Sequence, residues 1–282
     1  SLKRQKTSAN STATLVYAKL IYGDENILSK NILGDESSIP SITIDNLKNY
    51  YSLAFAPQNA NITIAGNIKE DNAIDVFKVL ESKWKETDIS VPLPNKFNSL
   101  SSSKVYFVDF PGAKQSEIRI GSTGLAFTDP DYFKATVMNY KLGGSFNGIV
   151  NLILREEKGY TYGARTTFTG SDFPGYFVAS AGVQSDATLE SAQIFRDEMI
   201  KYRNGISIED LQFTKDALIK SNALRYETIG ALRGMLSQIA WYNLPFDYVK
   251  DQERQISDMT LEQHKTLAQK YIHPDKMIYL IA

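Results

Sequence analysis

Cysteine is absent from this chain, and histidine occurs only twice, at His264 and His273. The lack of cysteine excludes disulfides and cysteine-ligated zinc, and it is compatible with either the cytoplasm or the periplasm. Neither histidine has a second histidine four residues away, so an HxxEH zinc motif is also excluded within these residues. We expect both histidines to be structural or exposed to solvent.

Long apolar runs and a large net charge are missing as well. No run approaches the roughly 18 apolar residues of a membrane-spanning helix, so the sequence predicts no transmembrane segment. The formal net charge is −1, which gives no reason to expect nucleic acid as a partner. With 43% hydrophobic and 22% charged residues over 282 positions, the chain has a globular composition and the length of one large or two small domains.

Two distant segments of the chain resemble each other. Residues 39–65, IPSITIDNLKNYYSLAFAPQNANITIA, align without a gap with residues 256–282, ISDMTLEQHKTLAQKYIHPDKMIYLIA. The offset is 217 residues, which is the separation of Thr43 and Thr260. In both segments the threonine suits a helix N-cap, an amphipathic helix follows and ends before a proline, and a β-rich run comes next. Coincidence between two helix–strand units is the alternative, and the ungapped match favours duplication.

The duplication divides the chain. It predicts the C-terminal part of a first α+β repeat over residues 1–90, a linker over 91–103, and a second repeat over 104–282. The front of the first copy would then be truncated. Predicted helices cover 11–22, 43–55, 70–85, 131–142 and 146–157, with four or five more over 187–271. Predicted strands cover 60–65, 104–110, 116–127, 160–169 and 175–184, with a last strand at the end. Long antiparallel strands packed on helices indicate an α+β fold.

The segment LGGSFNG, residues 142–148, invites comparison with a phosphate-binding loop. It lacks both the GK[ST] ending and the GxGxxG spacing of such loops. We expect instead that Gly143 and Gly144 end one helix, that Ser145 caps the next, and that Phe146 shapes the helix pair.

The segment LREEKGYTYGA, residues 154–164, carries the most specific signal. A predicted helix ends in charged residues, Gly159 suits its C′ position, and an alternating strand follows, on which Tyr160, Tyr162 and Ala164 would share one face. Arg155 in the last turn is explained equally well by the helix dipole. The functional alternative is that Arg155 and Tyr162 meet at the helix–strand junction and both donate hydrogen bonds to one carbonyl oxygen.

The segment LGGSFNGIVNLILREEKGYTYGA resembles the second repeat of the pitrilysin/insulinase family of zinc endopeptidases, which includes the mitochondrial processing peptidases. PQNANITIAGNI resembles a strand near the end of that family's first repeat. The resemblance extends from about residue 11 to the end of the chain. It implies a LuxS/processing-peptidase-like metallohydrolase fold, with two homologous α+β domains in each half and two halves closed around a chamber.

The same resemblance predicts the roles of individual residues. The family's zinc motif would fall on Ala135, Met138 and Asn139, none of which is a zinc ligand, so this chain resembles the metal-free half. We expect no cofactor in this chain and zinc in a partner half, in the same polypeptide or in another subunit. Arg155 and Tyr162 match the family's Arg/Tyr pair, which binds the substrate carbonyl and supports the oxyanion, and Tyr160 is expected to line the substrate-binding wall.

Two functions follow from this resemblance. In the first, the chain is the substrate-binding half of a zinc endopeptidase of bacterial type, is inactive alone, and binds a peptide together with a zinc-bearing half. In the second, it is a catalytically inert structural subunit of the same fold. An HxxEH motif in the partner half would distinguish the first function from the second.

Overall fold

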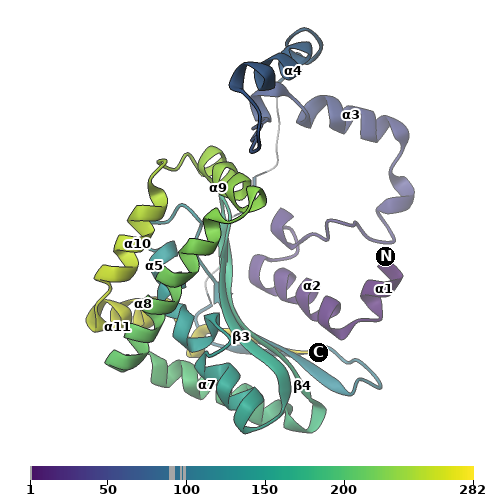
Figure 1. The fold of residues 1–282 in the computed structure, drawn as a ribbon. Helices are drawn as coiled ribbons and strands as arrows, with labels where there is room; N and C mark the ends of the chain where they lie inside the picture. The colour runs from purple at the N-terminus through teal and green to yellow at the C-terminus, as the bar shows by residue number, and fades with distance from the viewer. Residues whose placement is uncertain (1, 89–92, 96, 98–99) are drawn as a thin grey trace. The chain divides into compact units, whose positions relative to one another are not determined.

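The computed structural model describes residues 2–88, 93–95, 97 and 100–282 and has the predicted α+β architecture (Figure 1). The chain forms two compact units, one of residues 1–33, 94–218 and 252–282, the other of residues 34–93 and 219–251. The division into repeats at 1–90 and 104–282 stays a prediction, and part of the linker 91–103 lies outside the described residues. No helix of the described residues is long and apolar enough to cross a membrane.

A five-stranded sheet in the order β1-β5-β2-β4-β3 forms the centre of the first unit. Its strands are β1 (Lys104–Phe107), β2 (Gln115–Thr123), β3 (Thr161–Gly170), β4 (Pro174–Gln184) and β5 (Ile278–Ile281). The predicted long antiparallel strands are found in β2, β4 and β3, and the sheet is mixed because β1 and β5 pair in parallel. These two strands lie near opposite ends of residues 104–282, so no local pattern fixes their relative direction. β1 and β3 are the edges of the sheet.

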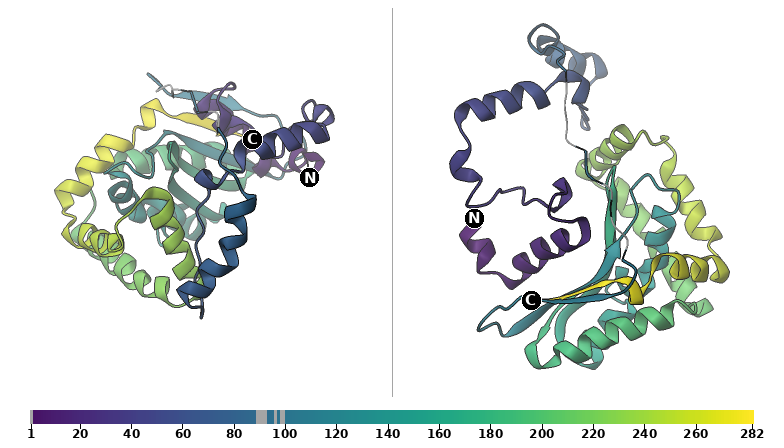
Figure 2. Two further views of the ribbon diagram at one scale, coloured as in Figure 1. Left: turned by 90° about the horizontal axis from the view of Figure 1, so that it is seen from above. Right: turned by 180° about the vertical axis from the view of Figure 1, so that it is seen from behind.

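Helices cover both faces of this sheet (Figures 1 and 2). Alternate residues of β4 face opposite ways: Phe177 and Ala179 join the main core, whereas Tyr176 and Val178 pack against α2 (Ala9–Tyr22). The hydroxyl of Tyr17 on α2 donates a hydrogen bond to the Phe177 carbonyl, at 2.9 Å. The main core lies under α5 (Tyr132–Asn139), α6 (Ile149–Asn151), α7 (Thr188–Tyr202) and α11 (Leu261–Tyr271).

Five α-helices lie over residues 187–271, as predicted. Besides α7 and α11 they are, in sequence order, α8 (Ile208–Asn222), α9 (Ile229–Tyr242) and α10 (Tyr248–Asp258). In the second unit, α3 (Ile44–Ala54) and α4 (Glu70–Lys83) match the predicted helices closely. The predicted strand over 60–65 is wrong, because these residues are not assigned to any strand in the described structure. A β-strand is assigned from its hydrogen bonds to a neighbouring strand, and an apolar sequence pattern does not show whether such a neighbour exists.

The two copies of the repeated segment share their local structure. α3 and α11 both begin with a complete capping box: the Thr43 and Thr260 hydroxyls accept hydrogen bonds from the Asn46 and Gln263 amides, and both N3 side chains bond back. Each helix is followed by a 3-10 turn that starts at a proline, Pro57–Asn59 or Pro274–Lys276. The threonine N-caps are therefore confirmed at both positions.

Candidate functional site

Arg155 lies on a helix that changes type along its length. The predicted helix over 146–157 begins only at Ile149, as α6, and continues as the π-helix η5 (Leu152–Glu157). The Lys158 amide donates to the Ile153 carbonyl at 3.0 Å, a five-residue spacing that widens the last turn. Gly159 then adopts φ +66°, so its predicted place as the C′ residue is confirmed.

In the loop before this helix, backbone segments lie so close together that a side chain would not fit between them. A Cβ atom on Gly143 would lie 2.6 Å from the Thr166 nitrogen, and one on Gly148 would lie 2.7 Å from the Gly143 Cα atom. These glycines let the loop, the helix and β3 pack together. Ser145 is not the predicted cap: Gly148 occupies the N-cap position, and the buried Ser145 Oγ has no hydrogen-bond partner in the described structure.

The guanidinium group of Arg155 is held from two sides. It lies over the Phe146 ring, 4.6 Å from the ring centroid, and its Nη1 is 2.5 Å from the Glu156 carboxylate. About a third of the Arg155 side chain, 34%, remains exposed. Stacking on an aromatic ring restricts the guanidinium plane while leaving N–H groups available to donate.

Tyr162 is 92% exposed and lies at an irregularity in β3. Thr161 pairs with Val183 and Ala164 with Ala181, so two residues of β3, Tyr162 and Gly163, oppose a single residue of β4. The Thr161 hydroxyl closes this bulge by donating to the Gly182 carbonyl at 2.6 Å and accepting from the Gly163 amide at 3.1 Å. The prediction that Tyr162 and Ala164 share a face is wrong, because the extra residue turns Tyr162 outward while Ala164 stays buried.

A buried asparagine that the sequence interpretation missed connects the two predicted donors. Asn151 is 2% exposed; its amide nitrogen donates to the Phe146 carbonyl at 2.7 Å, and its oxygen accepts from the Ala164 amide at 2.9 Å. One side chain thus ties the loop beneath Arg155 to the strand just after Tyr162. Helical periodicity gives no signal for it, because Asn151 falls outside the apolar face of Ile149, Val150, Ile153 and Leu154 in the predicted helix.

Tyr160 is engaged elsewhere. Its hydroxyl donates to one oxygen of Glu190 on α7 at 2.7 Å, and the Lys158 ammonium contacts the other oxygen at 2.7 Å. These two hydrogen bonds lower the pKa of Glu190, and the bond to Glu190 raises the pKa of Tyr160. The structure therefore anchors Tyr160 to α7, and its role in substrate binding stays a prediction.

The positions that match the zinc motif are packed into the core. Ala135, Met138 and Asn139 are all at most 3% exposed, and the Asn139 amide exchanges two hydrogen bonds with Thr166, at 2.8 and 2.6 Å. These residues do not fit a metal site. Across the described residues, no group of three or more histidine or carboxylate side chains is placed to hold a metal ion.

Both histidines also have structural surroundings. The Nε2 atom of His264 lies 3.2 Å from the Met138 carbonyl and 3.0 Å from the Tyr202 hydroxyl, between α5, α7 and α11. Burial lowers the pKa of His264 to about 4. His273 contacts the Arg203 guanidinium at 2.9 Å. The expectation of structural roles fits both positions.

The profile of the family described as "Peptidase M16 inactive domain" matches residues 41–218, which include the loop, helix and strand described above. The chain belongs to this family. An uncharacterized zinc protease of Streptomyces coelicolor is 24% identical over 80% of this chain and 50% of its own length. A protein of Helicobacter pylori named a non-peptidase homolog is 22% identical over 84% of this chain and 54% of its own length.

A crystal structure of a peptidase M16 inactive domain from Pseudomonas fluorescens superposes with a TM-score of 0.89 and 26% identity, covering 100% of this chain and 67% of that one. The fold is therefore that of an M16 inactive domain, and the predicted membership of a zinc protease family is confirmed. The chain spans about half the length of the curated relatives it matches.

Proposed function

We propose that this M16 inactive domain is the substrate-binding half of a zinc endopeptidase, and that Arg155 and Tyr162 donate hydrogen bonds to the substrate carbonyl at the scissile bond. The observation that carries the proposal is the presentation of both donors. The bulge in β3 exposes Tyr162 almost completely, and Phe146 and Glu156 hold the Arg155 guanidinium. A side chain this exposed contributes little to the core, and its hydroxyl stays available to donate a hydrogen bond.

The zinc-bearing half would supply the metal-activated water and the general base, in the same polypeptide or as another subunit. This chain contributes hydrogen-bond donors at the position where negative charge develops on the attacked carbonyl. In this scheme the isolated chain hydrolyses no peptide. The expected organisation remains that of two α+β repeats, 1–90 and 104–282, joined by the linker 91–103.

The edge position of β3 supports a mode of peptide binding. β3 pairs with β4 and is the last strand of the sheet, so an extended peptide can add to its free edge. Tyr162 lies at the start of this strand and Arg155 at the end of the preceding helix. Backbone pairing would align the peptide, while the two donors would select one carbonyl.

The test uses the assembly that contains the zinc half. Removal of one oxyanion donor costs about 10²–10³ in kcat in other enzymes, so Arg155→Ala should lower kcat by a factor of that order. Lys201→Ala is the control, because Lys201 also pairs with an acidic residue of its own helix, Glu198, at 2.6 Å. Unchanged peptide cleavage by Arg155→Ala in a folded assembly would rule out the proposed role.

A non-catalytic function is the second candidate. The Helicobacter pylori relative carries the name of a non-peptidase homolog, so the fold itself does not guarantee activity. In that case the assembly would form without an HxxEH half and would cleave no peptide. The sequence of the partner half distinguishes the two functions.

A further inference from the structure

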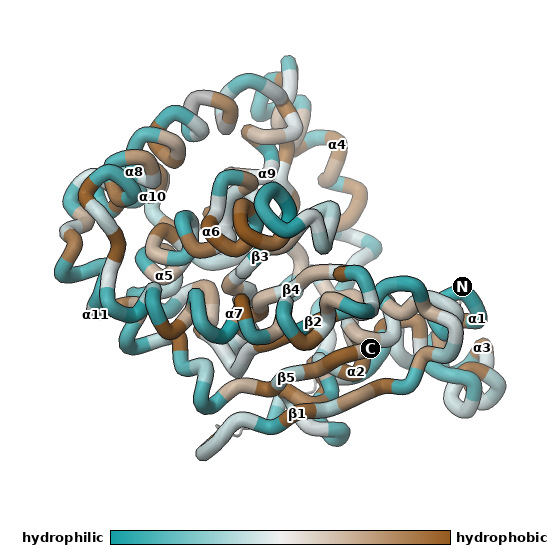
Figure 3. The backbone as a smooth tube through the Cα atoms, turned by 90° about the horizontal axis from the view of Figure 1, so that it is seen from below, coloured by the Kyte–Doolittle hydropathy of each residue, from teal (hydrophilic) through white to brown (hydrophobic). Residues whose placement is uncertain are grey.

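A large groove opens in the first unit between the edge strand β1 and α7. It has a volume of about 1060 Å³ and is bounded by β1, β5, α7 and the turn before β5. Figure 3 shows α7 running beside β5 and β1. Apolar side chains project into it from both walls: Val105 and Phe107 are 61% and 77% exposed, and Leu189 and Ile200 are 71% and 49% exposed. Such a concentration of exposed apolar groups indicates a surface that is normally covered.

The internal repeat indicates what covers it. Three residues of the groove wall are Pro274, Tyr279 and Ile281. At the offset of 217 residues their counterparts in the first repeat are Pro57, Ile62 and Ile64. These three also line one common hollow, of about 420 Å³, in the second unit. The same wall is therefore built twice, once in each unit.

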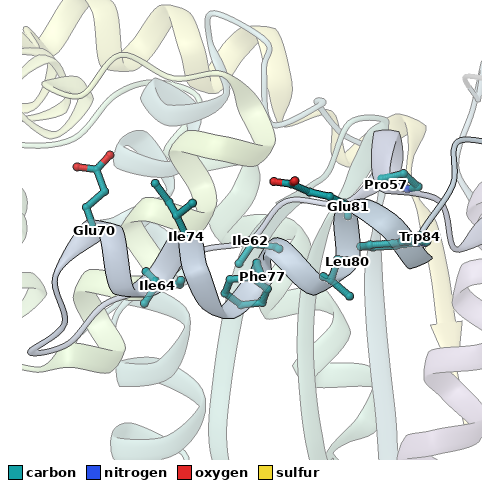
Figure 4. Close-up of a pocket in the computed structure, with 11 residues that line it drawn as sticks. Pro57, Ile62, Ile64, Glu70, Ile74, Phe77, Leu80, Glu81 and Trp84 are labelled. Carbon is teal, nitrogen blue, oxygen red and sulfur yellow. The ribbon is translucent and has the colours of Figure 1, made fainter.

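In the first repeat a helix faces this wall. Ile74, Phe77 and Leu80 of α4 line the same hollow as Ile62 and Ile64, and Figure 4 shows these side chains together. Their spacing of three residues places them along one side of the helix. α4 begins at Glu70, shortly after Ala65, and Ala65 is the counterpart of Ala282.

The charges of the two surfaces are complementary. The groove carries three cationic side chains, Arg196, Arg203 and Lys276, of which Arg196 is already paired with Asp197 at 2.8 Å, against two acidic ones, Asp186 and Asp275. The first turn of α4 carries two acidic residues, Glu70 and Asp71, directly after Lys69 at the N-cap. A helix of this pattern can place its apolar side on the groove floor and its acidic first turn near the cations.

We propose that the β1–α7 groove is the binding site of an amphipathic helix that follows β5 in the same polypeptide, as α4 follows the extended segment of the first repeat. Its apolar residues, spaced like Ile74, Phe77 and Leu80, cover Val105, Phe107 and Leu189. This inference is independent of the proposed peptidase role, because none of these residues belongs to the Arg155–Tyr162 site.

A graft tests the proposal in the complete chain. Residues 66–85, which contain α4 and its connection, are added again after Ala282. Because the chain has no cysteine, Phe107→Cys provides a single thiol in the groove, and its alkylation rate is measured with and without the graft. Lys114→Cys, at an exposed position between β1 and β2, is the control thiol. We expect the graft to slow labelling at position 107 by at least about tenfold, an order-of-magnitude estimate for burial in a stable interface, and to leave position 114 unchanged.

A second graft, with aspartate at the positions copied from Ile74, Phe77 and Leu80, should give no protection. Equal labelling with the two grafts would overturn the proposal. It would also be overturned if the ungrafted chain already labelled slowly in a concentration-dependent way, because a second copy would then cover the groove. Leu189→Cys on α7 repeats the measurement from the opposite wall and covers the case in which Phe107→Cys does not fold.

Discussion

Asn151 is expected to fix the loop beneath Arg155 relative to the strand that carries Tyr162. The free energy of unfolding lost when Asn151 is replaced can be estimated from its two hydrogen bonds. Asn151→Leu keeps the approximate size of the side chain but removes both of its hydrogen bonds. It leaves the buried Ala164 amide and the partly buried Phe146 carbonyl without partners. An unpaired buried polar group costs about 1–3 kcal/mol, and water can reach part of the Phe146 carbonyl, so the expected loss of unfolding free energy is about 2–4 kcal/mol.

The assay must report on the first unit. Both tryptophans of the chain, Trp84 and Trp241, lie in the second unit, so their fluorescence does not follow the unfolding of the sheet. Thermal unfolding is therefore followed by far-UV circular dichroism, which includes the sheet, and exchange of the Ala164 amide hydrogen reports on the first unit specifically. At about 2–4 °C per kcal/mol, the Tm should fall by roughly 10 °C, and the Ala164 amide should lose its protection.

Asn147→Leu is the matched control, because Asn147 is exposed in the same loop and should shift stability by less than about 0.5 kcal/mol. Asn151→Asp keeps the acceptor for the Ala164 amide and loses the donor to Phe146, so it separates the two bonds. An Asn151→Leu chain with the wild-type midpoint and a protected Ala164 amide would refute the reasoning.

Three further predictions concern stability. The pKa of His264 is about 4 in the folded chain and about 6.5 in the unfolded chain, so between these pH values the unfolded state binds the proton preferentially. The free energy of unfolding should therefore be highest above pH 6.5 and fall by about 3 kcal/mol as the pH drops through 4. In urea titrations at several pH values, His264→Gln should remove this dependence. Thr161→Val removes the hydroxyl that closes the β3 bulge and should cost about 1–2 kcal/mol in urea unfolding; no change would show that the bulge does not need this hydroxyl. Gly143→Ala places a methyl group against the Thr166 backbone and should cost about 1–3 kcal/mol, more than Gly144→Ala, and the reverse order of Tm values would contradict the close approach.

The sequence predicts those features of the site that depend on local chemistry. The threonine N-caps, the left-handed Gly159 and the position of Arg155 at a helix end follow from residue types within one or two turns. The repeat also identifies the helix–proline unit at both places, because the capping pattern and the proline are encoded in a contiguous segment.

The features that the sequence does not predict depend on contacts between distant segments. The bulge at Tyr162 is a mismatch between β3 and β4, and the parallel pairing of β1 with β5 joins strands from the two ends of residues 104–282. The role of Asn151 requires both the Phe146 carbonyl and the Ala164 amide to lie beside one helix turn. A strict alternation of residues along β3 therefore gave the wrong face for Tyr162.

The measurement that tests the central claim most directly compares wild type with Tyr162→Phe in the assembly that contains the zinc half, using a fluorogenic peptide. The substitution removes one hydroxyl from a side chain that is 92% exposed, so stability should not change. Tyr50→Phe on α3 is the control, because Tyr50 is also an exposed tyrosine, at 65%. A fall in kcat of about 10²–10³ with little change in KM is the predicted result, as expected for a donor that acts at the developing oxyanion. An unchanged kcat in an assembly that cleaves the peptide would contradict the proposed role of Tyr162.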